Sequence, residues 1–171
     1  MEHLTKEQLD SLLVVAKAAS QRDYLAIKLG YEHGLRISEV CGLTPDHVRD
    51  GFMVIQRLKG SLRTAQPLRP DTRKELDEYV KGMGAKQEIF GIKRSMLSKL
   101  FAKYAKLVSI PVHLAHFHIL KHTLAMYVIQ KAGIEDTRQY LGHRSIASTG
   151  CYLKTDDATA SAAIQRILSG V

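Results

Sequence analysis

Apolar residues recur at helical intervals over most of this 171-residue chain. Near the start, Thr5 and Gln8 have the spacing of a capping box, and an apolar stripe through Leu9, Leu12 and Leu13 follows directly. A helix is therefore expected almost from the first residue. The same periodicity predicts a short helix after Gly34 and further helices at residues 24–33, 71–80, 95–108, 117–132, 136–141 and 156–168.

The pattern changes after Val48. Residues 52–58 have the composition of a strand, residues 59–61 that of a turn, and residues 63–68 that of a returning edge strand, in which Pro67 is tolerated. Lys59 would then lie near the tip of a hairpin. Because no repeat or linker interrupts the chain, residues 1–171 are expected to form a single domain, mainly α with a small antiparallel β-sheet (α+β).

The composition narrows the class of protein. No apolar run is long enough to span a bilayer or to serve as a signal peptide, which predicts a cytoplasmic protein. Cys41 and Cys151 are too few for a disulfide framework and are expected to be reduced and structural. A net charge of +8 favours a nucleic-acid partner, although a basic surface that binds nothing has the same composition.

Polar side chains gather in the segment 118–152. His118, Lys121 and His122 share one face of a predicted helix, and His143 and Tyr152 follow. A zinc site is one interpretation, because four histidines cluster here, but no acidic or cysteine ligand is nearby and Lys121 would repel the cation. The histidines in question are His113, His116, His118 and His122. A phosphodiester anion is the other interpretation.

Two earlier residues and the tyrosine each allow a chemical and a structural interpretation. Arg36, just after Gly34, could grip two phosphate oxygens or simply pair with Glu39. Lys59 could donate a proton to a leaving oxygen or only aid solubility. Tyr152 could attack phosphorus if cations stabilise its phenolate, or could be a packing residue.

The order of these residues resembles the catalytic domain of the tyrosine recombinases, the phage integrase family. The resemblance rests on Gly-Leu-Arg-Ile-Ser-Glu at 34–39, the hairpin lysine, His-Ile-Leu-Lys-His-Thr at 118–123, Leu-Gly-His at 141–143, and a tyrosine nine residues later. It covers nearly the whole chain, from Thr5 to the C-terminal helix, and it implies the integrase catalytic-domain fold.

The resemblance also implies a role for each matched residue. Arg36 would clamp the phosphate, Lys59 would be the general acid, and His118 would assist proton transfer. His143 would bond a phosphate oxygen, and Tyr152 would attack the scissile phosphate to give a 3′-phosphotyrosyl link and a free 5′-hydroxyl. A hydroxyl of the partner strand would then reverse the step, so the family's reaction needs no metal or nucleotide cofactor.

Two departures qualify this expectation. Lys121 stands where the family usually has a second arginine, and a lysine keeps the charge but lacks the planar fork, so reduced activity is expected. The alternatives are a regulatory or architectural DNA-binding domain with weak or lost cleavage, and a nicking-closing enzyme like type IB topoisomerases. The N-terminal core-binding domain common in the family is also not seen, which predicts weaker, salt-dependent binding.

The expected partner is double-stranded DNA. Basic residues on or beside the predicted helix 95–108 are candidate phosphate contacts, namely Lys93, Arg94, Lys99 and Lys103. The small apolar helix at 156–168 would either cover the protein's own core or dock on a second copy on DNA. Self-association on DNA through this helix is the hypothesis that the family resemblance favours.

Overall fold

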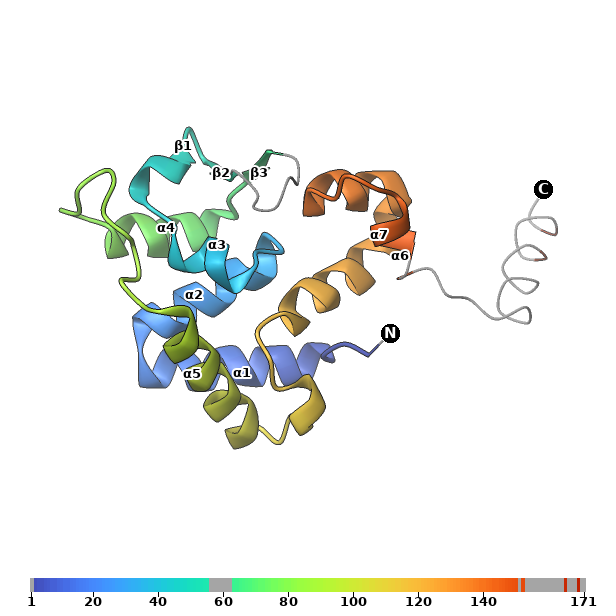
Figure 1. Ribbon diagram of the computed structural model, residues 1–171, viewed down its shortest axis with the longest axis horizontal. Helices are drawn as coiled ribbons and strands as arrows, with labels where there is room; N and C mark the ends of the chain where they lie inside the picture. Colours follow the sequence, from blue (N-terminus) through green and yellow to red (C-terminus); the bar gives the residue numbers. More distant parts are fainter. Residues whose placement is uncertain (1, 56–62, 151, 153–164, 166–168, 170–171) are drawn as a thin grey trace.

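The computed structural model describes residues 2–55, 63–150, 152, 165 and 169 (Figure 1). The first half contains α1 (Lys6–Ala19), α2 (Gln21–Glu32), α3 (Ile37–Cys41), the 3-10 turn η1 (Pro45–His47), β1 (Val48–Arg49), β2 (Phe52–Ile55) and β3 (Thr64–Pro67). The second half contains α4 (Pro70–Tyr79), α5 (Arg94–Leu107), the 3-10 turn η2 (Val112–Leu114), α6 (Ile119–Leu141) and α7 (Ala147–Gly150). The predicted class, mainly helical with a small antiparallel sheet, is confirmed.

Local signals fix the first helices. Thr5 Oγ1 accepts a hydrogen bond from the Gln8 N–H, and the Gln8 side chain accepts one from the Thr5 N–H, so the predicted capping box is confirmed. Ser20 then caps α2, which starts at Gln21, three residues earlier than predicted. Ser20 can do so because its hydroxyl accepts from the Asp23 N–H.

The sheet has the order β1-β2-β3, and both pairs are antiparallel. The predicted pair of strands is present, with Val54 opposite Ala65, and β3 is an edge strand, as Pro67 requires. The two-residue strand β1 was not predicted. Residues 56–62, where Lys59 was placed at the hairpin tip, lie outside the described residues.

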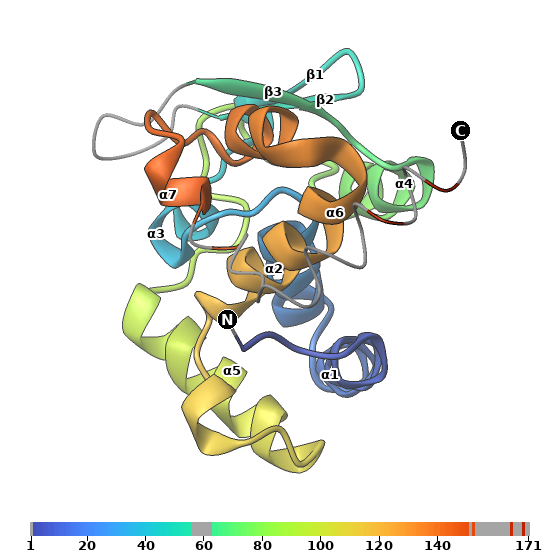
Figure 2. The same cartoon turned by 90° about the vertical axis from the view of Figure 1, so that its right-hand side faces the viewer.

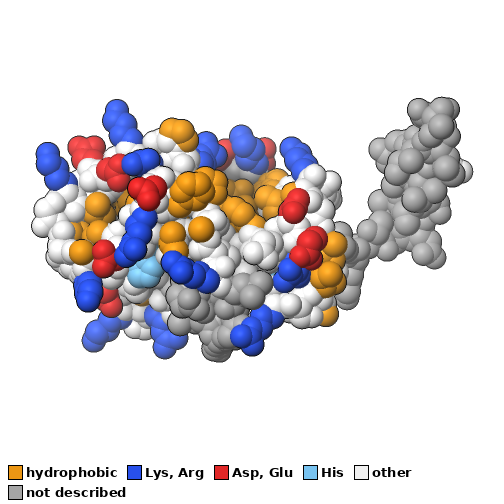
Figure 3. All heavy atoms as spheres, turned by 90° about the horizontal axis from the view of Figure 1, so that it is seen from above, with side chains coloured by type: hydrophobic (Ala, Val, Ile, Leu, Met, Phe, Trp, Pro, Cys, Tyr) orange, Lys and Arg blue, Asp and Glu red, His pale blue; other side chains and the backbone are white. Residues whose placement is uncertain are grey.

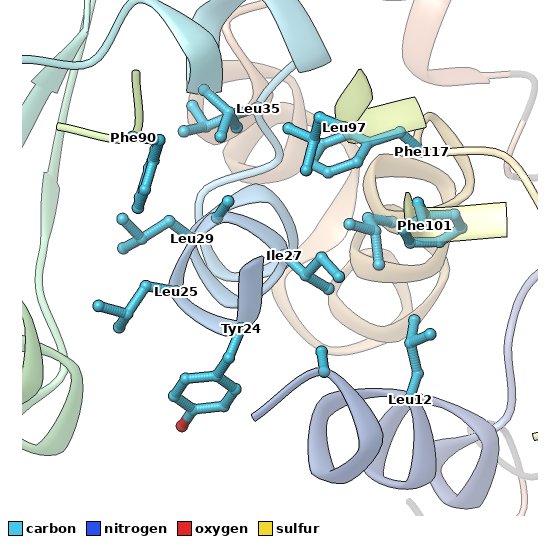
Figure 4. Close-up of a cluster of buried hydrophobic side chains, with 14 of the residues drawn as sticks. Leu12, Tyr24, Leu25, Ile27, Leu29, Leu35, Phe90, Leu97, Phe101 and Phe117 are labelled. Atoms are coloured by element: carbon cyan, nitrogen blue, oxygen red, sulfur yellow. The ribbon is translucent and has the colours of Figure 1, made fainter. Parts of the chain in front are cut away.

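Helix α2 runs through the centre of the molecule, with the sheet on one side and α1 and α5 on the other (Figures 1 and 2). Its residues 23–30 are all buried, and the surrounding cluster includes Leu12, Leu97 and Phe101 (Figure 4). Its buried Asp23 accepts a hydrogen bond from the Tyr104 hydroxyl at 2.6 Å. Burial and this bond to Asp23 raise the pKa of Tyr104 to about 12.

Lys28 is the second buried charge in α2. Its ammonium donates to Glu75 at 2.9 Å and to Asp71 at 3.1 Å, which ties α2 to α4. Burial disfavours the charged form, but the hydrogen bonds to Glu75, Tyr24 and Asp71 outweigh that penalty and raise the pKa of Lys28. The central helix therefore has a partner for each of its buried ions.

Helix α6 changes direction at Gly133, whose backbone is non-helical (φ 80°, ψ 175°). This conformation is essentially restricted to glycine, so the chain can turn sharply here. The two helices predicted at 117–132 and 136–141 are accordingly the two halves of α6. The second half packs toward the sheet, because Gln66 Nε2 of β3 donates to the Tyr140 carbonyl. Gln66 Oε1 accepts a hydrogen bond from His33 Nδ1, after α2, at 2.8 Å.

Two further expectations concern cysteines and membranes. Cys41 is a buried free thiol, as predicted, whereas Cys151 lies outside the described residues. Within the described part of the chain, every helix is too short or too polar to span a bilayer. The predicted helix at 156–168 also falls on residues that are not described, apart from Gln165.

Candidate active site

Arg36 begins α3 and is held by the last residue of that helix's first turn. Its backbone N–H donates to Glu39 Oε2 at 2.8 Å, and its guanidinium donates to Glu39 Oε1 at 3.0 Å. The Glu39 side chain is only 1% exposed, whereas that of Arg36 is 28% exposed. A buried carboxylate thus orients a partly exposed guanidinium, and the pairing with Glu39 is compatible with phosphate binding.

Gly34 explains why this turn lies against α6. Its φ of +57° is in the left-handed region, and a Cβ there would be 2.6 Å from Leu141 Cδ2. Only glycine therefore lets the segment before Arg36 approach the end of α6. Lys121 Cγ lies 3.8 Å from the same point, so α6 faces this turn with residues from both of its halves.

His118, His122 and Tyr152 form a chain of contacts. The His118 and His122 rings meet edge to face, with centroids 4.5 Å apart. His122 Nδ1 lies 2.9 Å from the Tyr152 hydroxyl, in hydrogen-bonding contact, and the two rings are tilted with centroids 5.7 Å apart. The nucleophile candidate is therefore joined to the predicted histidine pair, although it is also packed, at 7% exposure, against the second half of the core.

Lys121 is more deeply buried than His118 and His122. It is 2% exposed, and its ammonium donates to the Leu141 carbonyl at 3.1 Å. The last carbonyls of a helix carry partial negative charge, which favours a cation there. The lysine that stands in place of the usual arginine therefore lies inside the protein, between the two ends of α6.

His143 is positioned by the turn that carries Tyr152. Its Nδ1 lies 2.9 Å from the Thr149 hydroxyl, and its carbonyl accepts a hydrogen bond from Arg138 at 2.8 Å. The Thr149 carbonyl in turn accepts from the Tyr152 N–H at 3.1 Å. His143 and Tyr152 are therefore connected through one buried threonine of α7.

The electrostatics of the site favour neutral histidines. Partial burial lowers the pKa of His118 to about 4, and His122, Lys121, His116 and Arg36 add to the effect. Burial, His116 and Lys121 also lower the pKa of His122. Both imidazoles can therefore accept protons at neutral pH, and the surrounding cations would attract an anion such as a phosphodiester.

The predicted DNA contacts divide into two groups. Lys93 and Arg94 line a shallow groove of about 450 Å³ together with Ser95, Ser98 and Ile37, the residue next to Arg36. Lys99 and Lys103 are also exposed, but they lie on the side of α5 opposite its buried residues. Only the first pair is thus beside the candidate site. Elsewhere, Lys and Arg side chains are spread among acidic ones, as one face shows (Figure 3).

Three residues without a predicted catalytic role also lie at the site. Glu39 was predicted only as a possible structural partner of Arg36, and His122 only as a possible zinc ligand. Glu39, Thr149 and His122 hold Arg36, His143 and Tyr152 respectively. The position of His122, four residues after His118, was the signal available in the sequence. Of the six predicted catalytic residues, Lys59 lies outside the described residues, and the structure places the other five.

The alternative of a metal site finds little support in the geometry. His113 Nε2 lies 2.9 Å from the Glu2 carboxylate. Among the described residues, no three His, Cys, Asp or Glu side chains are grouped so as to hold a metal ion.

Comparison with known proteins gives consistent matches. Residues 2–159 match the model of the phage integrase family. A tyrosine recombinase of Pseudothermotoga lettingae is 32% identical over 158 residues, which cover 87% of this chain and 55% of that protein. The type 1 fimbriae regulatory protein FimE of Escherichia coli is 32% identical over 177 residues, which cover 91% of this chain and 87% of that protein. The chain thus spans about half the length of the first relative and most of the second.

Solved structures share the fold. A Tn1549 transposon integrase in complex with transposon right end DNA superposes with a TM-score of 0.79 and 20% identity, over 98% of this chain and 66% of the other. The XerH site-specific recombinase bound to its difH substrate gives a TM-score of 0.77 and 20% identity, over 95% of this chain and 53% of the other.

Proposed function

This chain belongs to the phage integrase family, and from that premise we propose that it cleaves and rejoins DNA strands through a covalent link between Tyr152 and a 3′-phosphate. The observation that carries the proposal is the hydrogen bond between the Tyr152 hydroxyl and His122, beside His118. A phenol, two neutral imidazoles and nearby cations are the groups that an attack on phosphorus needs.

The proposed roles follow from where each side chain lies. Arg36, oriented by Glu39, would bind non-bridging phosphate oxygens, and His143 would bond another. Tyr152 would attack the phosphorus, and the 5′-oxygen would leave with a proton from Lys59, which lies outside the described residues. Lys93 and Arg94 would hold the neighbouring backbone phosphates through the groove next to Arg36. Acting on DNA would place the protein in the cytoplasm.

A nicked suicide duplex tests this function. The short strand between the cleavage site and the nick dissociates after cleavage, and its loss traps the covalent intermediate because the 5′-hydroxyl needed for rejoining is gone. The wild type should form a protein–DNA adduct, and Tyr152→Phe should form none. Tyr127→Phe is the matched control, since its hydroxyl bonds only weakly to the Leu4 carbonyl at 3.4 Å, remote from His122. Adduct formation by Tyr152→Phe would contradict the proposal.

A second candidate function is DNA binding without cleavage, and the burial of Lys121 favours it. The ammonium is bonded to the Leu141 carbonyl in a residue that is only 2% exposed, so a phosphate has little access to it in this conformation. Salt-sensitive binding to duplex DNA without an adduct would support this candidate. Plasmid relaxation without recombinant products would instead point to a nicking-closing enzyme.

Self-association on DNA through the helix at 156–168 is a further part of the proposal. One solved relative is a lambda integrase dimer bound to a COC′ core site. A hollow of about 340 Å³ on α6 supports docking of a small apolar helix from a second copy. It is lined by Leu124, Val128, Ala132 and Tyr140, with Asp136 and Thr137.

Sedimentation of the protein with a target duplex tests this assembly. The wild type should form protein dimers or larger assemblies on the duplex, and Ala132→Glu should remain a monomer, because a carboxylate in the hollow opposes an apolar helix. Ala18→Glu, on the exposed side of α1, is the control and should assemble normally. A wild-type monomer at all concentrations would contradict the proposal.

A further inference from the structure

His122 has no role in the scheme above, yet it contacts the atom that would react. Its Nδ1 lies 2.9 Å from the Tyr152 hydroxyl oxygen. His118, to which the family resemblance assigns help with proton transfer, is exposed and meets His122 through a ring contact. The geometry therefore raises the question of which histidine takes the proton of Tyr152.

The backbone on both sides of His122 is fixed. Lys121 is buried and bonded to the Leu141 carbonyl. Thr123 is fully buried, where its hydroxyl accepts from the Leu4 N–H at 3.0 Å and donates to the Ile119 carbonyl at 2.8 Å. Because both neighbours are anchored, the imidazole of His122 is presented in a defined position, half-buried beneath His118.

Tyr152 is fixed from the opposite side. Its ring is packed in a small cluster with Leu124, Ala125 and Ile129, and its N–H donates to the Thr149 carbonyl. The hydroxyl of a side chain buried to this degree is shielded from bulk water, which strengthens its hydrogen bond. The contact between His122 and Tyr152 thus joins two separately anchored groups from α6 and the segment after α7.

The charges around His122 favour its neutral form. His116, His118 and Lys121 lie beside it on its own segment, and Tyr152 lies against it after α7. Arg36, at the start of α3, acts on the neighbouring His118. Burial, His116 and Lys121 lower the pKa of His122 below the ordinary 6.5. A neutral imidazole with its proton on Nε2 leaves Nδ1 free to accept from the phenol.

We propose, building on the function proposed above, that His122 is the proton acceptor that activates Tyr152. The O–H bond of Tyr152 breaks and its proton passes to His122 Nδ1, giving an imidazolium. The phenolate oxygen forms a bond to phosphorus, the bond from phosphorus to the 5′-oxygen breaks, and that oxygen takes a proton from the general acid. In the rejoining step a 5′-hydroxyl attacks phosphorus and gives its proton to the deprotonated general acid. The bond from phosphorus to the Tyr152 oxygen breaks, and the imidazolium returns its proton to that oxygen.

This assignment moves the proton transfer, which the resemblance gives to His118, to His122. His118, the more exposed of the two histidines, is left available to a phosphate oxygen, while the half-buried His122 carries the proton. The imidazolium formed at His122 also adds a positive charge beside the phosphate as negative charge develops there.

The test is the pH dependence of single-turnover adduct formation on the suicide duplex, for the wild type, His122→Asn and His118→Asn. Asparagine can still accept a hydrogen bond from the phenol but cannot take its proton. In the wild type, the rate should rise with pH and level off above an apparent pKa that lies below 6.5. His122→Asn should be about 10²-fold slower at neutral pH, and its rate should keep rising toward the pKa of the phenol itself.

The control and the adverse outcomes are distinct. His118→Asn should keep the wild-type shape of the profile, and urea unfolding at pH 7 should show that both variants are folded; His122→Gln replaces His122→Asn if the latter is unstable. A wild-type adduct together with an unchanged profile for His122→Asn overturns the inference and leaves the proposed function standing. Loss of the plateau in His118→Asn alone assigns the proton to His118. Absence of any wild-type adduct overturns both proposals.

Discussion

The ammonium of Lys121 donates a hydrogen bond to the Leu141 carbonyl at 3.1 Å, although 20 residues separate them within one helical segment. In a straight helix these residues would be about 30 Å apart. The reversal at Gly133 brings them together, so that α6 folds back on itself. As a result, Lys121, which stands in the usual arginine position, binds the C-terminal end of α6. The turn that contains His143 therefore lies near the start of α6.

Gly133→Ala tests the reversal. Its backbone conformation disfavours any side chain even though the surrounding space is open, so the substitution should lower the free energy of unfolding by about 1–3 kcal/mol. It should also slow adduct formation, because Leu141 and His143 would shift. Urea unfolding and the suicide-duplex assay measure the two effects.

Gly82→Ala is the matched control. Gly82 also has a positive φ, of 84°, and open space, but it lies after α4. This variant should lose about 1 kcal/mol of stability and keep the wild-type rate of adduct formation. A wild-type rate in Gly133→Ala would show that the reversal does not position the site.

Lys121→Arg should raise the rate of adduct formation by about 10²-fold. Arginine has five N–H donors, so one can keep the bond to the Leu141 carbonyl while others reach a phosphate. Lys131→Arg, on the same helix and exposed, is the control and should change nothing. If Lys121→Arg cleaves no faster than the wild type, the lysine is not what limits the site.

Glu39→Gln should slow adduct formation about tenfold with little loss of stability, because the guanidinium of Arg36 loses the charge that orients it. The effect should appear in the single-turnover rate more than in duplex affinity. Glu78→Gln, exposed on α4, provides the comparison. Equal rates for the two variants would mean that Arg36 is oriented by other contacts.

The stability of the protein should fall as the pH drops below 6.5, before the carboxylates titrate. The pKa values of His118 and His122 are lowered in the folded state, that of His118 to about 4. In the unfolded chain both histidines bind protons near pH 6.5, whereas in the folded chain they do so only at lower pH. Proton uptake by the unfolded state favours unfolding. Comparison of urea midpoints at pH 7 and pH 5 measures the change.

The variant His118→Asn should show a smaller change in midpoint between these two pH values. The hydrogen bond with Lys28 lowers the pKa of Asp71 to about 2. The stability that Asp71 contributes is therefore lost only at lower pH, as the pH falls below the ordinary value of 3.8. The window from pH 7 to pH 5 therefore lies above the range in which Asp71 contributes. An identical change in the wild type and His118→Asn would contradict the assignment.

Much of the fold was predictable because its signals are local. The capping box at Thr5, the edge strand with Pro67 and the helix boundary at Gly133 depend on residues a few positions apart. The short elements β1 and α7 were missed, since two or four residues carry no measurable period. They form because longer elements hold them in place.

The sequence by itself determined the family, the helical elements and the inventory of reactive groups, because neighbouring residues and their order carry that information. Only the tertiary structure decided that Tyr152 contacts His122 and that Lys121 points into the protein. Both contacts join residues that lie 20 or 30 positions apart. Such pairs meet only through the path of the chain, which depends here on one glycine torsion and on the packing of α6 against its surroundings.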